Sequence, residues 1–162
     1  MIKSNSPKVE IRKARSSDLK AILALNQQMV DLHHALDPYY DASRNSAKRL
    51  GHRLKEFLQE PETLIVIAEN QKGIVGFLIG NIDNPALLMK PKQIGKILEI
   101  FVSDDFRKTG VGEKLVKYFM EWLPKSQICN IELSVDSRNL GGIAFWKKLG
   151  FQEFNKRMRK DF

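Results

Sequence analysis

The sequence lacks the features of a secreted or membrane-spanning protein. Its single cysteine, Cys129, cannot form an internal disulfide, and no run of about 18 apolar residues is present to cross a bilayer. The first residues, MIKSNSPKVEIRKA, contain no apolar stretch of the kind that a secretory signal needs. We therefore expect a cytoplasmic protein with no membrane partner.

The chain also lacks internal repeats, low-complexity tracts and linkers. Its hydrophobic share of 43 % and its charged share of 28 % are ordinary for a globular domain. At 162 residues it is long enough to bury a substantial core. We therefore expect residues 1–162 to form a single domain.

Acidic residues are fewer than basic ones: the chain has 19 Asp and Glu and 27 Lys and Arg, which gives a formal net charge of +8. Such a charge favours an anionic partner, which could be a phosphorylated cofactor, a nucleic acid or a ribosome. The densest cluster, NKRMRK at 155–160, alternates like a strand with one solvated face. No aromatic residues interleave with it to stack on bases, so the pattern favours a strand over a nucleic-acid patch.

Apolar spacing predicts alternating helices and strands. The order strand, two helices, three strands, helix, strand, helix, strand predicts a mixed α/β fold with a largely antiparallel front half. Strands are expected at 9–14, 63–69, 74–83, 96–102, 128–135 and 151–161, with a polar turn at 70–73, and helices at 17–37, 47–58, 110–123 and 141–150.

Two glycines stand one residue apart in DDFRKTGVGEKL (104–115), where a predicted strand leads into a predicted helix. Such a turn gathers backbone N–H groups at the positive end of the helix dipole, a geometry that binds phosphate. Gly110 and Gly112 would let a phosphate approach the backbone, and Arg107 and Lys108 add positive charge. A P-loop is excluded because Glu113 follows the second glycine. The alternative is a basic surface turn in which the glycines only relieve crowding.

The residues Arg107, Gly110 and Gly112 resemble the acetyl-CoA pyrophosphate motif of the GNAT family of N-acetyltransferases, which follows the fourth strand and opens the third helix. Downstream, NLGGIAFWKKLGF resembles the second signature of the family, with Asn139 and the Leu-Gly-Phe ending at 149–151 matching. The opening VEIRKARSSDLKAI is similar to the usual first strand and helix of the family. The resemblance covers nearly the whole chain.

The resemblance implies a largely antiparallel central sheet flanked by helices, as in acyl-CoA N-acyltransferases, with two splayed strands that hold acetyl-CoA between them. It implies direct transfer of the acetyl group to a primary amine, with no covalent enzyme intermediate and no metal. The cofactor residues that it implies are Ile100, Phe101, Val102, Arg107, Lys108, Thr109, Gly110, Val111, Gly112, Glu113, Asn139 and Trp146.

Two departures from the family pattern bear on catalysis. Relatives often carry an acidic pair where this chain has Leu98 and Glu99, so Glu99 alone is the candidate base; the alternative is a solvated strand carboxylate. Many relatives place a tyrosine, the acid for the leaving thiolate, where this chain has Trp146, whose indole N–H has no accessible acidity. Because thiols have a pKa of about 8.5, the thiolate can leave without that acid.

The stretch DLHHALDPYY lies where the family contacts the acceptor, so the resemblance implies acceptor contacts for His33, His34, Tyr39 and Tyr40. The alternative is that these side chains only pack a helix end. Two adjacent histidines do not converge like metal ligands. The acceptor would be an amine-bearing small molecule or protein, and the resemblance leaves a homodimer open. The alternatives to an enzyme are a catalytically silent acyl-CoA-binding module and a basic protein associated with ribosomes or nucleic acid.

Overall fold

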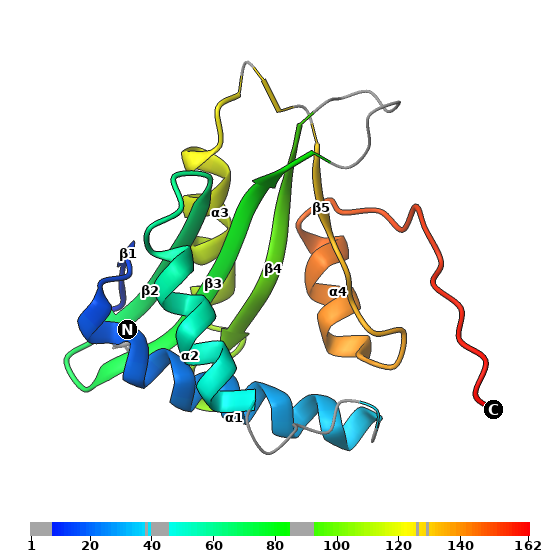
Figure 1. Cartoon of the computed structure of the whole chain (residues 1–162), viewed down its shortest axis with the longest axis horizontal. Coiled ribbons are helices and arrows are strands. Elements are labelled where there is room, and N and C mark those ends of the chain that lie inside the picture. Colours follow the sequence, from blue (N-terminus) through cyan, green and yellow to red (C-terminus); the bar gives the residue numbers. More distant parts are fainter. Residues whose placement is uncertain (1–7, 38, 40–45, 85–92, 126, 129) are drawn as a thin grey trace, which may run out of the picture.

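The structure of the chain, a computed structural model, describes residues 8–37, 39, 46–84, 93–125, 127–128 and 130–162. Tyr40 and Cys129, both singled out in the sequence, lie outside these residues. The predicted order of elements is confirmed up to the last one (Figure 1). In the described part the helices are α1 (Leu19–Leu36), α2 (Ser46–Phe57), α3 (Val111–Trp122) and α4 (Leu140–Lys148), and the strands are β1 (Glu10–Lys13), β2 (Thr63–Asn70), β3 (Gly73–Asp83), β4 (Ile94–Val102) and β5 (Ile131–Leu133).

The strands form one sheet in the order β1-β2-β3-β4-β5. The neighbours from β1 to β4 are antiparallel, whereas β4 and β5 are parallel. A parallel pair needs a crossover connection, and α3 supplies it between β4 and β5. The mixed, largely antiparallel sheet that the sequence predicts is therefore confirmed.

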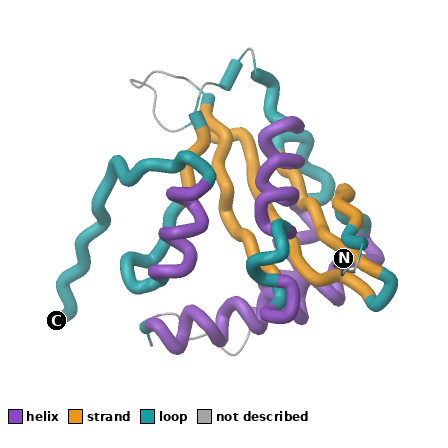
Figure 2. Tube along the Cα trace, turned by 180° about the vertical axis from the view of Figure 1, so that it is seen from behind, coloured by secondary structure: helices purple, strands orange, loops and turns teal. Residues whose placement is uncertain are grey.

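Helices cover both faces of the sheet (Figures 1 and 2). On one face, Ile22 of α1 and Leu54 of α2 are fully buried against strand residues that include Phe77. On the other face, Leu115 and Phe119 of α3 are fully buried in a second apolar cluster. Each such side chain contributes about 1.5–3 kcal/mol by leaving water, so the two clusters fix α1 and α3 on opposite faces of β4.

An ion-pair network fixes the start of α1. Arg12 of β1 contacts Asp18, just before the helix, at 2.8 Å and Glu69 of β2 at 2.6 Å. The hydrogen bond from Arg12 is the main reason that the pKa of the Asp18 carboxyl lies below its usual range. The network therefore ties the beginning of α1 to the strands and directs the rest of the helix across the end of the sheet (Figure 1).

The predicted last strand is wrong, because residues 151–162 form neither helix nor strand. Phe154, Met158 and Phe162 are 73 %, 93 % and 110 % exposed, so their apolar side chains have no core to join. The preceding strand is also shorter than predicted, with three residues in β5. Alternation alone cannot make a strand, since strands are stabilised by side-chain pairs with a neighbouring strand. A search of the described helices found none with the length and apolar character to span a membrane.

Candidate functional site

The site begins where β4 and β5 separate. The two strands pair only through residues 95–97 of β4 and 131–133 of β5. Figure 1 shows them diverging toward the end of β4. Among the described residues, positions 98–102 therefore have a strand neighbour, β3, on one side only. The splayed strands that the sequence analysis expects are confirmed.

Backbone groups of β4 alternate between β3 and the open side. The N–H of Ser103 donates to the carbonyl of Val75 in β3 at 2.9 Å. In an antiparallel ladder every second residue exchanges these bonds, so Phe101 also directs its backbone groups to β3, whereas Ile100 and Val102 direct theirs to the open side. The Phe101 side chain is 6 % exposed and packs under α1. The assignment of Phe101 to the cofactor therefore needs correction, because neither its ring nor its backbone faces the opening.

A β-bulge at Leu98 changes which way the side chains of β4 point. Ile79 of β3 pairs with Glu99, but the next residue, Gly80, pairs with Ile97, so Leu98 is an extra residue. In a regular strand, residues two apart face the same side. Across this bulge, Ile97 packs in the cluster on the α3 side, while Glu99 faces α1. Because of the bulge, Ile97 lies in the core on the α3 side, whereas Glu99 lies on the opposite face, at the candidate site.

Glu99 is partly buried beneath α1. The side-chain Nδ2 of Asn26, on the buried side of that helix, donates to Oε2 of Glu99 at 2.9 Å. Burial raises the pKa of the Glu99 carboxyl, and the Asn26 hydrogen bond lowers it by less. A carboxyl with a raised pKa is better matched to accepting a proton near neutral pH. The arrangement therefore suits Glu99 to general base chemistry.

The turn between β4 and α3 presents a helix N-terminus without a side-chain cap. Lys108 and Gly110 have positive φ angles of 60° and 86°, and Gly110 is the N-cap of α3. The hydroxyl of Thr109 caps the turn itself, because it donates to the Phe106 carbonyl at 2.6 Å. The N–H groups of the first helical turn, at residues 111–113, have no partner within the helix. Such a concavity of N–H groups favours an anion.

Gly110 and Gly112 are glycine for different structural reasons. A Cβ at Gly110 would meet nothing within 4 Å, so its glycine is required by the left-handed φ of 86°. A Cβ at Gly112 would lie 3.2 Å from the ring of Phe145 in α4. Gly112 therefore lets the Phe145 ring pack against the backbone of α3, a structural reason for this glycine besides the expected approach of a phosphate.

Two charged residues at this turn, Arg107 and Glu113, already have partners in the protein. Arg107 contacts Asp104 at 2.9 Å, and its Nε donates to the carbonyl of Val102, on the open side of β4, at 3.1 Å. Glu113 forms an ion pair with Lys148 of α4. An anion in the turn would thus compete with Asp104 for Arg107, whereas Glu113 is held away by α4.

Asn139 and Trp146 both stabilise α4. Asn139 is the N-cap, and its Oδ1 accepts from the N–H of Gly142 at 2.9 Å. Trp146 is 7 % exposed and packs edge-on against Phe145 and Phe151, with ring centroids 4.8 and 5.1 Å away. The placement gives Trp146 a packing role in the core, not the exposed ring that a cofactor wall would need.

The predicted acceptor residues lie at the C-terminal end of α1. His33 and His34 are in its last turns, and Tyr39, 69 % exposed, follows the helix. The guanidinium of Arg159, near the end of the chain, lies 5.2 Å from the Tyr39 ring. Across the described ranges, no three His, Cys, Asp or Glu are grouped so as to hold a metal ion.

A buried carboxylate joins three distant segments at this end of α1. Asp37 is 7 % exposed, and its Oδ2 accepts from Arg138 at 2.7 Å and from Arg159 at 3.1 Å. The backbone N–H of Tyr39 donates to the other oxygen at 3.0 Å. The pKa of Asp37 is lowered to about 2, chiefly by the hydrogen bond from the Tyr39 N–H and then by the one from Arg138. The sequence offered no signal for this cluster, because Arg138 and Arg159 lie 101 and 122 positions from Asp37.

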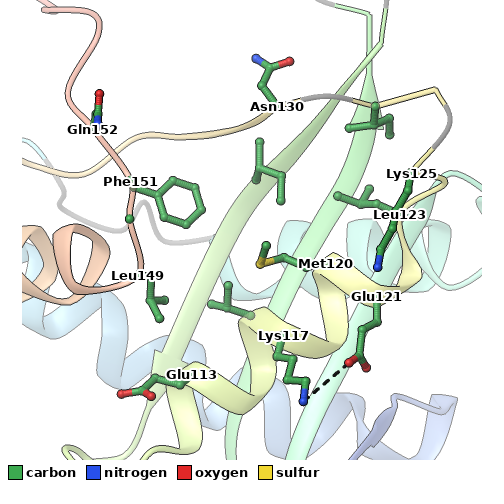
Figure 3. Close-up of a pocket in the computed structure, with 14 residues that line it drawn as sticks. Glu113, Lys117, Met120, Glu121, Leu123, Lys125, Asn130, Leu149, Phe151 and Gln152 are labelled. Atoms are coloured by element: carbon green, nitrogen blue, oxygen red, sulfur yellow. Dashed lines mark ion pairs between the residues drawn. The ribbon is translucent and has the colours of Figure 1, made fainter.

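A separate open groove of about 760 Å³ runs between α3 and β5 (Figure 3). Met120, Leu149 and Phe151 line it, and Lys117 and Glu121 form an ion pair along its rim. Glu99 and the β4 opening are not part of it. We place the candidate site at the splayed strands, because there the open edge of β4 leads directly into the uncapped N-terminus of α3.

An open strand edge that leads into an uncapped helix N-terminus is the architecture of an acyl-CoA-binding N-acyltransferase fold. The profile of the Acetyltransferase (GNAT) family matches residues 27–151. The chain thus belongs to the GNAT family, a family of acyltransferases.

Known proteins agree with this membership. An uncharacterized N-acetyltransferase of Methanocaldococcus jannaschii is 29 % identical over 88 % of this chain and 60 % of its own length. The chain thus spans less than two thirds of that relative. Among solved structures, a tetramutant of the BH1408 protein from Bacillus halodurans shares 18 % identity with a TM-score of 0.83, covering 94 % of this chain and 99 % of that one. An aminoglycoside N-acetyltransferase, AAC(6')-Iy, in complex with CoA shares 18 % identity with a TM-score of 0.77 and 99 % coverage of both chains.

Proposed function

We propose that this protein is an acetyl-CoA-dependent N-acetyltransferase that transfers the acetyl group to a primary amine by direct attack. The open edge of β4, which leads into the uncapped N-terminus of α3, carries the proposal. An extended pantetheine arm can pair with the strand edge while its diphosphate meets the N–H groups of the turn. The solved complex of AAC(6')-Iy with CoA, which has the same fold, supports this choice of cosubstrate.

On the cosubstrate side, the backbone groups of Ile100 and Val102 are the proposed partners of the pantetheine arm. The N–H of Ile100 would also stabilise the negative charge that develops on the thioester oxygen. Arg107 and Lys108 would face the diphosphate, for which Arg107 exchanges its bond to Val102 or Asp104. The backbone, more than any side chain, therefore recognises the cosubstrate.

In the chemical step, the amine nitrogen bonds to the thioester carbonyl carbon and the carbon–sulfur bond breaks. The amine loses a proton to Glu99, directly or through a water, and the departing thiolate takes up a proton from solvent. Holding thioester and amine in one geometry can supply about 7–11 kcal/mol of the barrier reduction. The need for Glu99 depends on the acceptor, because freeing a lysine amine at pH 7 costs about 4.6 kcal/mol, whereas an α-amine costs about 1.4 kcal/mol.

Two measurements test the proposal. Calorimetry with acetyl-CoA should show binding, and thiol release across a panel of primary amines should show transfer. Binding without release from any amine would indicate a silent acyl-CoA-binding module. Absence of binding, together with retention on RNA, would indicate a basic nucleic-acid-associated protein.

The Glu99→Gln variant tests the base. It should keep its acetyl-CoA affinity within about twofold and lose about 10²–10³-fold in kcat/KM for a lysine-like amine. Glu132→Gln is the matched control, since Glu132 is a carboxylate of the neighbouring strand β5 that accepts a hydrogen bond from Asn130. Equal activity of both variants would remove Glu99 from the mechanism.

A further inference from the structure

Asn26 is a polar residue in the buried stripe of α1. It is 7 % exposed, and Leu19, Ile22 and Leu25 are the other buried residues of the same helix. A buried amide is costly unless its polar atoms have partners. The partner here is Glu99, whose Oε2 lies 2.9 Å from Nδ2 of Asn26. A packing role alone would be filled better by an aliphatic residue.

The hydrogen bond fixes the Glu99 carboxyl from one side only. Asn26 engages Oε2, and no described residue donates to Oε1. The donor end of the amide faces the carboxyl, which suits the ionised form of Glu99. The bond therefore orients the side chain without using the oxygen that would receive a proton.

Other charged groups around Glu99 are engaged elsewhere. On its face of the sheet, Lys96 of β4 is paired with Asp83 of β3 at 3.0 Å. Glu132 on β5 accepts from Asn130. His33 stands two turns beyond Asn26 on α1 and has an interaction of its own. α3 packs on the opposite face of β4 through apolar side chains.

We propose that Asn26 is a positioning residue that holds Oε2 of Glu99 and leaves Oε1 to accept the proton of the attacking amine. This rests on the proposed function, because it gives Glu99 the role of base. Burial raises the pKa of Glu99, and the Asn26 bond limits that rise. Removal of the donor should therefore raise the pKa further and move the acidic limb of activity to higher pH.

The carboxyl of Glu99 can be titrated directly by NMR of protein with ¹³C-labelled glutamate, with Glu99→Gln identifying the resonance. In Asn26→Leu we expect its titration midpoint to rise by about one pH unit or more, as for loss of a hydrogen bond to a charged group. Asn26→Asp keeps the shape and places a second carboxyl against Glu99, so the pair should share a proton and titrate higher than Glu99 alone. Gln27→Leu is the matched control, because its amide is on the exposed side of α1, bonded to Asp31.

The pH profile of kcat/KM with acetyl-CoA and a lysine-like amine is the second readout. Its acidic limb should move with the NMR midpoint in both Asn26 variants and stay fixed in Gln27→Leu. An unmoved NMR midpoint in folded Asn26→Asp and Asn26→Leu would overturn the proposal. A uniform loss of activity at every pH would also overturn it, since that is the effect of a structural role. A moved midpoint in a protein without transfer activity would refute the proposed function and leave the control of Glu99 by Asn26 in place.

Discussion

Replacement of Gly110 by aspartate is the sharpest test of where the diphosphate binds. Gly110 has a φ of 86°, and a Cβ there meets nothing within 4 Å. The only expected cost to stability is that of a residue other than glycine in a left-handed conformation. This is about 1–2 kcal/mol, or about 2–8 °C in Tm for a chain of this size. The variant should fold, and its effect on ligand binding can be measured.

The added carboxylate would stand in the concavity where the diphosphate is proposed. At about 6 Å and an effective dielectric constant of about 20, two unit negative charges repel by about 3 kcal/mol. We therefore expect Gly110→Asp to weaken acetyl-CoA binding by on the order of 100-fold in calorimetry. Gly110→Ala carries the same backbone strain without the charge and should lose less.

Gly150 provides a matched control for strain. Its φ is 87°, and a Cβ there also meets nothing within 4 Å, but it lies at the end of α4 instead of the β4–α3 turn. Gly150→Asp should lose a similar amount of stability and keep its affinity for acetyl-CoA. If Gly110→Asp binds acetyl-CoA within threefold of the unchanged protein, the diphosphate does not occupy this turn. If both variants lose affinity equally, the effect comes from the fold.

Other substitutions test the packing and the ion pairs. Gly80→Ala would bring a Cβ against the Phe119 ring and within 2.9 Å of the Lys96 carbonyl, so it should cost about 1–3 kcal/mol in urea unfolding; an unchanged midpoint would contradict the packing. Trp146→Tyr should retain transfer activity at reduced stability, and a folded but inactive variant would show that the indole is needed. Because the pKa of Asp37 is lowered to about 2, its contribution is complete above about pH 4 and is lost as the pH falls toward 2, so stability of Asp37→Asn should depend less steeply on pH in that window. Equal slopes for the two proteins would contradict this.

The sequence predicted the strand, turn and helix at the proposed cosubstrate end of the site because their signals are local. Gly110 marks a left-handed turn, and a strand followed by an amphipathic helix frames it within about 20 residues. The bulge at Leu98 left no such signal, because the run ILEIFV is apolar except for Glu99 and its faces cannot be told apart by alternation. The prediction of a last strand at 151–161 was wrong, because alternation of charged and apolar residues suggested a strand that has no neighbouring strand to pair with.

The Asp37 cluster beside the proposed acceptor residues was beyond prediction because it depends on contacts between distant segments. Asp37 reads as a helix-ending residue before Pro38, and nothing local shows that Arg138 and Arg159 converge on it. Asn26 can be noticed in the sequence, because it is the one amide among the buried positions of the first helix, which are otherwise mostly apolar. A polar residue in such a stripe indicates a buried partner, but only the fold shows that the partner is Glu99.

α1 connects the two halves of the proposed mechanism. Asn26 holds the proposed base, and His33, on the proposed acceptor surface, lies seven residues or about 10 Å further along the same helix. Ion pairs fix both ends of α1, through Arg12 and Asp18 at its start and through Asp37 at its end. A rigid helix held at both ends keeps the spacing between acceptor surface and base constant. Loosening the Asp37 end should therefore disturb the use of the amine, while the cosubstrate, bound by β4 and α3, keeps its own contacts.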